Sequence, residues 1–125
     1  MSAPATTAAG VKIKRVYDAA QQSDGYRVLI DRVWPRGLSK ERANVDEWAR
    51  ELAPSTELRR WFAHEPSRFQ EFRARYRAEL DRQRGRVQEL RRRAEAGPLT
   101  ILYGARDREH NNAVVLAELL REGSA

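Results

Sequence analysis

Two short, uninterrupted apolar runs most constrain the fold that this chain of 125 residues can adopt. The first is Val28-Leu29-Ile30, within the segment 26–31, and the second lies within the segment 99–103. An apolar run of this length, bounded by turn or charged residues, indicates a strand that is buried on both faces of a sheet. Such strands are typical of parallel sheets covered by helices. The sequence therefore predicts two central, parallel, neighbouring strands.

Further elements are expected before, between and after these two strands. Residues 11–17 alternate apolar and basic side chains, which is the period of a half-buried strand, and residues 18–25 are predicted to form a loop. The stretch between the buried strands has apolar residues at helical spacing, divided by Pro and Gly residues. The predicted helices are 45–52, 56–63, 66–96 with a break or bend at Gly85, and the largely apolar 111–121.

The expected fold is a single small α/β domain that spans residues 11–123. Its central sheet has at least three strands, two of them parallel, flanked by helices, with a helical insertion between the buried strands. A chain of this length can bury one hydrophobic core. Residues 1–10 carry no apolar pattern and are predicted to form a disordered tail.

Composition excludes several classes of function. The chain has no Cys, which rules out disulfides, thiolate zinc sites, iron–sulfur clusters and thiol catalysis. With two His and no recognised nucleotide-binding glycine loop, we expect no metal and no cofactor. The apolar runs are far shorter than the roughly 20 residues of a membrane helix, and the first ten residues do not resemble a secretory signal. The sequence predicts a cytoplasmic monomer or homodimer without membrane contact.

Polar residues follow each buried strand, at 31–37 and at 103–112. Because neighbouring parallel strands end at the same edge of a sheet, and ligands bind at that edge, we expect the two loops to form one cleft. The candidate acid–base residues are Asp31, Asp107 and His110. The candidate ligand-binding residues are Arg32, Trp34, Arg36, Tyr103, Asn111 and Asn112.

These residue types suit an anionic ligand. Arg32 and Arg36 carry planar donor groups that match a phosphate or carboxylate. Asn111 and Asn112 stand at the start of a predicted helix, whose free N–H groups favour an anion. Trp34 offers a flat face for stacking. Our first hypothesis is a cleft for a small phosphate-bearing molecule, such as a nucleotide, and whether the protein is an enzyme stays open.

Ordinary structural roles compete with these assignments. Asp107 is well placed to cap the last helix, and Asp31 to pair with a nearby arginine. Trp34 has the character of a core aromatic residue. His64 stands at the junction of two predicted helices, where a hydrogen-bonding role is favoured over a catalytic one.

The basic charge is concentrated in one segment. Residues 68–93 contain ten Arg and four acidic residues, a net charge of +6, which equals the formal charge of the whole chain. Pairs such as Glu71 and Arg75, four residues apart, indicate a solvated, salt-bridged helix. The alternative function is a non-enzymatic module that binds nucleic acid or an acidic protein, although no recognised nucleic-acid motif is present. Its candidate residues are Arg82, Arg84, Arg86, Arg91, Arg92 and Arg93.

Several blocks of the sequence, taken together and in order, resemble the YeaO-like branch of the DUF488 family. The blocks are VLIDRVWPRGLSK at 28–40, LAPS at 52–55, LRRWFAH at 58–64, LYGARD at 102–107 and HNNA at 110–113. The resemblance covers roughly residues 11–122. It implies a small α/β protein whose activity is uncharacterised, and its signature includes both loops of the predicted cleft.

Two properties associated with the family do not carry over by this resemblance. Some members are labelled as MarR-type regulators, but this sequence has no evident winged-helix pattern. The broader family often has a Cys-His-Arg group where this chain has Asn111-Asn112-Ala113, so thiol or metal chemistry does not transfer to that position. The signature residues that match are Asp31, Arg32, Trp34, Pro35, Arg36, Gly37, Tyr103, Asp107, His110, Asn111 and Asn112.

Overall fold

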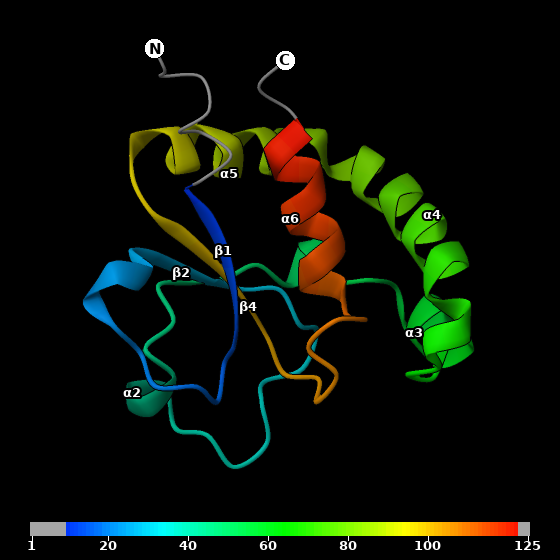
Figure 1. Cartoon of the computed structure of the whole chain (residues 1–125), viewed down its shortest axis with the longest axis horizontal. Coiled ribbons are helices and arrows are strands. Elements are labelled where there is room, and N and C mark those ends of the chain that lie inside the picture. The colour runs from blue at the N-terminus through cyan, green and yellow to red at the C-terminus, as the bar shows by residue number, and fades with distance from the viewer. Residues whose placement is uncertain (1–9, 123–125) are drawn as a thin grey trace.

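Four strands pair in parallel, in the order β1-β4-β2-β3, in a computed structural model that describes residues 10–122 (Figure 1). The strands are β1 (Val11–Arg15), β2 (Tyr26–Leu29), β3 (Glu47–Trp48) and β4 (Leu99–Tyr103). The two strands predicted to be central, β2 and β4, are neighbours in the middle of the sheet. The predicted α/β class and the parallel central pair are therefore confirmed. Most of the predicted tail, residues 1–9, lies outside the described residues.

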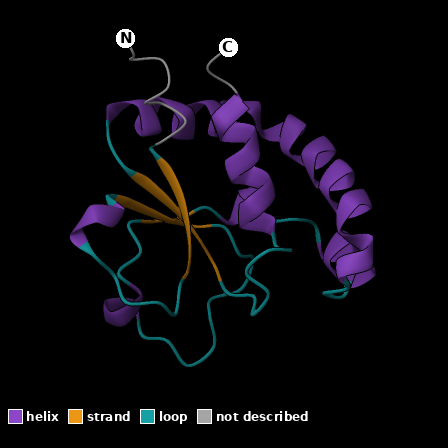
Figure 2. Ribbon diagram, viewed as in Figure 1, coloured by secondary structure: helices purple, strands orange, loops and turns teal. Residues whose placement is uncertain are grey.

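Helices and short 3₁₀ turns together make up most of the rest of the described chain (Figure 2). The helices are α2 (Lys40–Ala43), α3 (Thr56–Phe62), α4 (Phe69–Leu80), α5 (Arg84–Ala96) and α6 (Asn112–Glu122). Short 3₁₀ turns occur at Gln22–Asp24, Arg50–Leu52, Pro66–Arg68 and Asp81–Gln83. The last of these turns interrupts the long predicted helix just before Gly85.

One face of the sheet carries the main hydrophobic core. Alternate residues of the central strands, among them Val28 on β2 and Ile101 on β4, pack with apolar side chains from α3, α4, α5 and α6. The periodic residues of α4 are all buried in this cluster, as their spacing predicts; they are Phe69, Phe72, Tyr76 and Leu80. Helix α6 packs against β1, β4 and α4, which explains why it is apolar on so much of its surface (Figure 1).

The opposite face of the sheet has a smaller apolar cluster, and it corrects one predicted helix. Residues 45–52 form β3 and a 3₁₀ turn instead of a helix. Their apolar side chains divide between the two faces: Val45 and Trp48 pack with Leu29 and Leu102, whereas Ala49 and Leu52 join the main core. The helix predicted from this spacing is therefore wrong. The segment runs along the edge of the sheet, and its apolar residues contribute to both clusters.

A buried ion pair stabilises the same opposite face. Arg27 on β2 and Asp24 are 2 % and 1 % exposed, and Arg27 Nη1 donates to Asp24 Oδ2 at 2.5 Å. The remaining donors of Arg27 reach the carbonyl oxygens of Ala43 and Asn44, at 2.8 and 2.9 Å. Lys14 on β1 also pairs with Asp24, at 3.0 Å. The pair thus joins two strands to the end of α2.

Burial by itself would raise the pKa of Asp24, but the N–H of Gln21 and the side chains of Lys14 and Arg27 together hold that pKa below its ordinary value of 3.8. The stabilisation that these donors provide is therefore present above the ordinary value. It is lost as the pH falls through the lower folded-state pKa.

Replacing Arg27 with Met should lower the free energy of unfolding by about 3–5 kcal/mol, because the variant removes the buried cationic partner of a buried carboxylate. Urea denaturation near neutral pH measures this loss, and the onset of acid unfolding should move to higher pH. Arg42→Met, which changes an exposed arginine on α2, is the matched control. Equal stabilities of the two variants would contradict a structural role for the buried pair.

Candidate functional site

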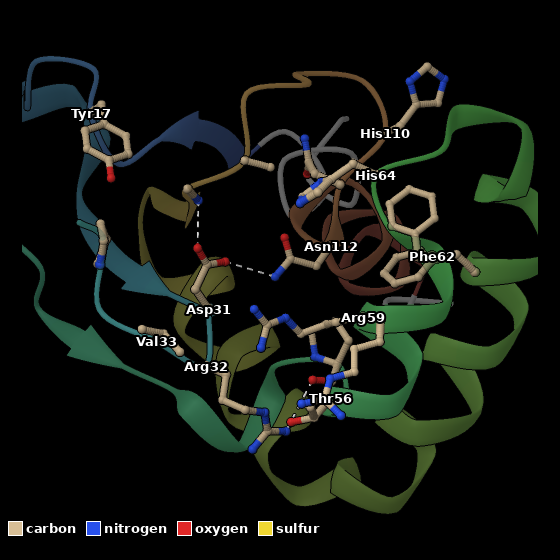
Figure 3. Close-up of a pocket in the computed structure, with 17 residues that line it drawn as sticks. Tyr17, Asp31, Arg32, Val33, Thr56, Arg59, Phe62, His64, His110 and Asn112 are labelled. Atoms are coloured by element: carbon tan, nitrogen blue, oxygen red, sulfur yellow. Dashed lines mark hydrogen bonds between the residues drawn. The ribbon is translucent and has the colours of Figure 1, made fainter.

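A cleft of about 560 Å³ lies at the edge of the sheet where β2 and β4 end (Figure 3). The loops that follow β1, β2 and β4 line it, together with α3 and its flanking residues. Five of the residues predicted from the sequence contribute to its wall: Asp31, Arg32, His110, Asn111 and Asn112. Four others do not: Trp34, Arg36, Tyr103 and Asp107.

The register of the two central strands brings the loops together. Leu29 pairs with Leu102, and the N–H of Ile30 donates to the carbonyl oxygen of Leu102 at 3.2 Å. The next residue, Asp31, then faces Gly104, whose N–H donates to Asp31 Oδ2 at 2.8 Å. A Cβ atom at position 104 would lie 2.8 Å from that oxygen. Any other residue at position 104 would therefore displace the Asp31 carboxylate from its present place.

Asp31 lies at the centre of the cleft (Figure 3). In addition to the Gly104 contact, its Oδ1 accepts a hydrogen bond from Asn112 Nδ2 at 3.2 Å. Burial raises the pKa of Asp31, and the hydrogen bonds and the nearby charge of Arg59 reduce that rise without cancelling it. Within residues 10–122, Asp31 forms no salt bridge, so the alternative that it simply pairs with an arginine is wrong.

The two asparagines use their side chains within the protein. Asn111 is the true cap of α6, because its Oδ1 accepts from the N–H of Val114 at 3.0 Å. Asn112 Nδ2 donates to Ile30 O as well as to Asp31, at 3.1 and 3.2 Å. Both amide hydrogens of Asn112 are thereby occupied. Asn112 fixes the position of the Asp31 carboxylate, and its side chain has no donor left for a ligand.

Asp107 is not the cap predicted from the sequence. Its Oδ1 accepts from the N–H groups of Glu109 and His110, at 2.9 and 3.0 Å, and so shapes the turn that precedes α6. The Glu109 N–H is the main reason that the pKa of Asp107 lies below its usual value. Its other oxygen is 2.9 Å from His110 Nδ1. Although residue 110 lines the cleft, this contact and the edge of Phe69 hold its imidazole pointing away from Asp31 (Figure 3).

His64 belongs to the cleft, although the sequence favoured a junction role for it. It follows the end of α3, where Ala63 and His64 both have positive φ angles, of 50° and 58°. This left-handed turn places the imidazole on the cleft wall, near Phe62 (Figure 3). The His64 ring makes no hydrogen bond to another residue in the range 10–122. The prediction that it hydrogen-bonds at the junction is therefore wrong for the described chain.

Three arginines line the cleft: Arg32 from the loop after β2, and Arg59 and Arg60 from α3. None of them forms a salt bridge within residues 10–122. Arg32 makes one hydrogen bond, from Nη2 to the carbonyl oxygen of Pro54, at 3.3 Å. The α3 arginines were not predicted, since only tertiary packing brings α3 to the strand ends. In the sequence, only the position of Arg59 and Arg60 within the LRRWFAH block could have pointed to a role for them.

The predicted residues outside the cleft have structural surroundings. Trp34 packs edge-on against Trp48, with ring centroids 5.3 Å apart, and its Nε1 donates to Leu38 O at 2.6 Å. Tyr103 is buried in the main core. Arg36 has an exposed side chain, and its carbonyl oxygen accepts from the hydroxyl of Tyr17 at 2.9 Å. Trp34 and Tyr17 thus hold the loop after β2 in place, and Arg36 is not part of the cleft wall.

Most of the arginines proposed for nucleic-acid binding already have partners. Arg84 pairs with Asp81 at 2.9 Å, and Arg86 contacts three carboxylates, those of Glu47, Glu51 and Glu89. Arg91 donates to the carbonyl oxygen of Leu119 at 2.9 Å. The guanidinium group of Arg93 lies over the ring of Tyr26, 3.8 Å from the ring centroid. Within the described chain, Arg82 and Arg92 are exposed and form no salt bridge.

Two further classes of site are absent from residues 10–122. No group of three or more His, Asp or Glu side chains is placed to hold a metal ion. None of the helices in this range is long and apolar enough to cross a membrane.

Comparison with known proteins gives one family. The family model described as "Inactive DUF488-N3 subclade" matches residues 10–125. The chain is 48 % identical over 111 residues to the protein YeaO of Escherichia coli strain K12. The alignment covers 89 % of this chain and 96 % of YeaO. It is 41 % identical over 110 residues to Rv3073c of Mycobacterium tuberculosis strain H37Rv, covering 88 % of this chain and 92 % of that protein. No solved structure matches the chain.

The carboxyl group of Asp31 should titrate above its ordinary pKa of 3.8, whereas that of Asp107 should titrate below 3.8. Carbon-detected NMR of the side-chain carboxyls measures both. Arg59→Ala should raise the pKa of Asp31 further, because it removes a positive charge that opposes the effect of burial. Asp31 therefore contributes its full share to the free energy of unfolding at a pH below 3.8. That contribution is lost as the pH rises through the higher pKa of the folded state. A titration of Asp31 at or below 3.8 would contradict this description of the cleft.

Proposed function

The chain belongs to the DUF488 family, and we propose that it binds a small anionic, phosphate-bearing ligand in the cleft between the loops after β2 and β4, without transforming it. The observation that carries this proposal is that three arginines around one cavity, Arg32, Arg59 and Arg60, form no salt bridge within the described residues 10–122. The cavity volume of about 560 Å³ lies within the range of ligand pockets.

Arginine geometry supports phosphate as the charged group. The guanidinium fork donates two parallel hydrogen bonds to phosphate oxygens and keeps its charge at every physiological pH. Arg59 on α3 lies close enough to Asp31 for its charge to act on that carboxyl, and Arg32, from the loop after β2, extends toward Pro54 beside the start of α3 (Figure 3). Thr56, the first residue of α3, also lines the cleft. Elsewhere on the protein, arginines such as Arg73 and Arg77 are neutralised by glutamates of α6. The free cations of the cleft are therefore available to a ligand.

Two observations support binding over turnover. The matching family model carries the description "inactive", which we extend to this chain as part of the proposal. In addition, Asp31 has no hydrogen bond to a histidine within residues 10–122, and the carboxylate–imidazole pair that does form, Asp107 with His110 at 2.9 Å, has its carboxylate outside the cleft wall. A general acid or base must lie within hydrogen-bond reach of the reacting group.

Replacing Arg59 or Arg32 with Ala should weaken phosphate binding at least about tenfold, because each change removes charge-assisted hydrogen bonds of roughly 1.5–3 kcal/mol. Thermal shift with adenosine 5′-monophosphate, ribose 5-phosphate and inorganic phosphate measures this. In the unsubstituted protein, a compound at roughly 100 times its Kd should add about 2.7 kcal/mol of stability. The melting temperatures without ligand should stay nearly unchanged, since Arg32 and Arg59 are exposed.

Arg36→Ala is the matched control, because it is the same substitution in the same loop as Arg32 but outside the cleft wall. It should leave binding intact, and any bound compound should be recovered chemically unchanged. The proposal fails if no phosphate compound shifts the melting temperature, or if Arg36→Ala weakens binding as much as Arg59→Ala. A shift produced only by oligonucleotides and abolished by salt would instead favour the arginine-rich helix.

A further inference from the structure

We infer that the ligand of this cleft is a sugar phosphate, whose phosphate contacts the arginines and whose hydroxyl groups donate hydrogen bonds to Asp31. This inference rests on the proposed function and adds the chemistry of the second half of the ligand. The inference starts from the carboxylate of Asp31, which accepts hydrogen bonds from the protein but has acceptor capacity left over.

Asp31 has unused acceptor capacity that faces the cleft. A carboxylate offers about four lone-pair sites, and two are taken, by the Gly104 N–H at 2.8 Å and by Asn112 Nδ2 at 3.2 Å. Both of these donors belong to residues of the cleft wall itself. No other residue in the range 10–122 donates to this carboxylate, and Trp48 Nε1 donates to the backbone carbonyl oxygen of Asp31 at 2.7 Å. Because the group lines the cavity, its two remaining acceptor sites are open to a ligand (Figure 3).

The wall keeps this carboxylate in place. Asn112 Nδ2 is anchored by its second hydrogen bond, to Ile30 O at 3.1 Å, and Asn112 itself is the first residue of α6. The Gly104 N–H belongs to the backbone that directly follows β4. The acceptor is therefore preorganised by two fixed elements, which lowers the entropy cost of binding a donor.

The neighbouring charges select a neutral donor for Asp31. A second anionic group beside the carboxylate would be repelled, so the phosphate must lie toward the arginines. A ligand ammonium group would be attracted to Asp31 but repelled by Arg59, whose charge acts on the same carboxyl. A hydroxyl group meets neither penalty. The cleft thus combines a cationic side for a phosphate with an acceptor for hydroxyls, and the aromatic side chains of Tyr17 and Phe62 line the space around them.

Two ligands that differ only in their hydroxyls test the inference. Ribose 5-phosphate and tetrahydrofurfuryl phosphate share the ring and the phosphate, but the second lacks the three ring hydroxyls. By isothermal titration calorimetry near neutral pH, ribose 5-phosphate should bind at least about tenfold more tightly, as expected for a hydrogen bond to a charged acceptor. Asp31→Asn should reduce this ratio to near one while tetrahydrofurfuryl phosphate still binds.

Asp81→Asn, the same substitution at an exposed turn between α4 and α5, should preserve the tenfold preference. Equal affinities of the unsubstituted protein for the two phosphates would overturn the inference but leave the proposed function standing. Failure of both compounds to bind would overturn the inference, and it would overturn the proposed function as well if adenosine 5′-monophosphate and inorganic phosphate also fail to bind. The comparison of the two affinities in the unsubstituted protein tests the inference even if Asp31→Asn does not fold. In that case Asp31→Ser is the second variant, and it should lose the same preference for ribose 5-phosphate.

Discussion

The site depends on the parallel pairing of β2 with β4. This pairing places Ile30 beside Leu102 and, one residue later, brings Asp31 within 2.8 Å of the Gly104 N–H, a hydrogen bond between residues 73 positions apart. Without this register the two loops would not share a wall. The contact also explains why the strand after the helical insertion must be followed by a glycine, since any side chain at position 104 would meet the carboxylate.

The two faces of the sheet carry different stabilising interactions. The face toward α3–α6 is an apolar core, in which burial supplies the main driving force. The other face contains the buried Arg27–Asp24 pair, whose donors and acceptors are satisfied by strands and by the end of α2. Removing one partner of such a pair is costly, because the other charge is left buried without compensation. The edge between these faces stays open, and it is there that an acidic group and free arginines coexist.

The sequence predicted the strands and the edge of the sheet better than the individual contacts. Period and length identified β2 and β4, since apolar runs report burial directly. The same reasoning failed at residues 45–52, where apolar residues serve two clusters on opposite faces. It placed Asp31 and Arg32 at the cleft but could not find Arg59 or His64, because α3 reaches the site only through packing. Loop residues such as Trp34 and Arg36 were assigned by position along the chain, which does not determine side-chain direction.

Chemical-shift mapping on ¹⁵N-labelled protein titrated with ribose 5-phosphate tests the central claim most directly, since it locates the binding site without any substitution. The claim is that one cleft, formed where β2 and β4 end, binds the ligand. The largest changes should occur at the backbone amides of Asp31, Arg32, Arg59 and Gly104. Changes confined to α5, or spread evenly over the surface, would contradict the claim.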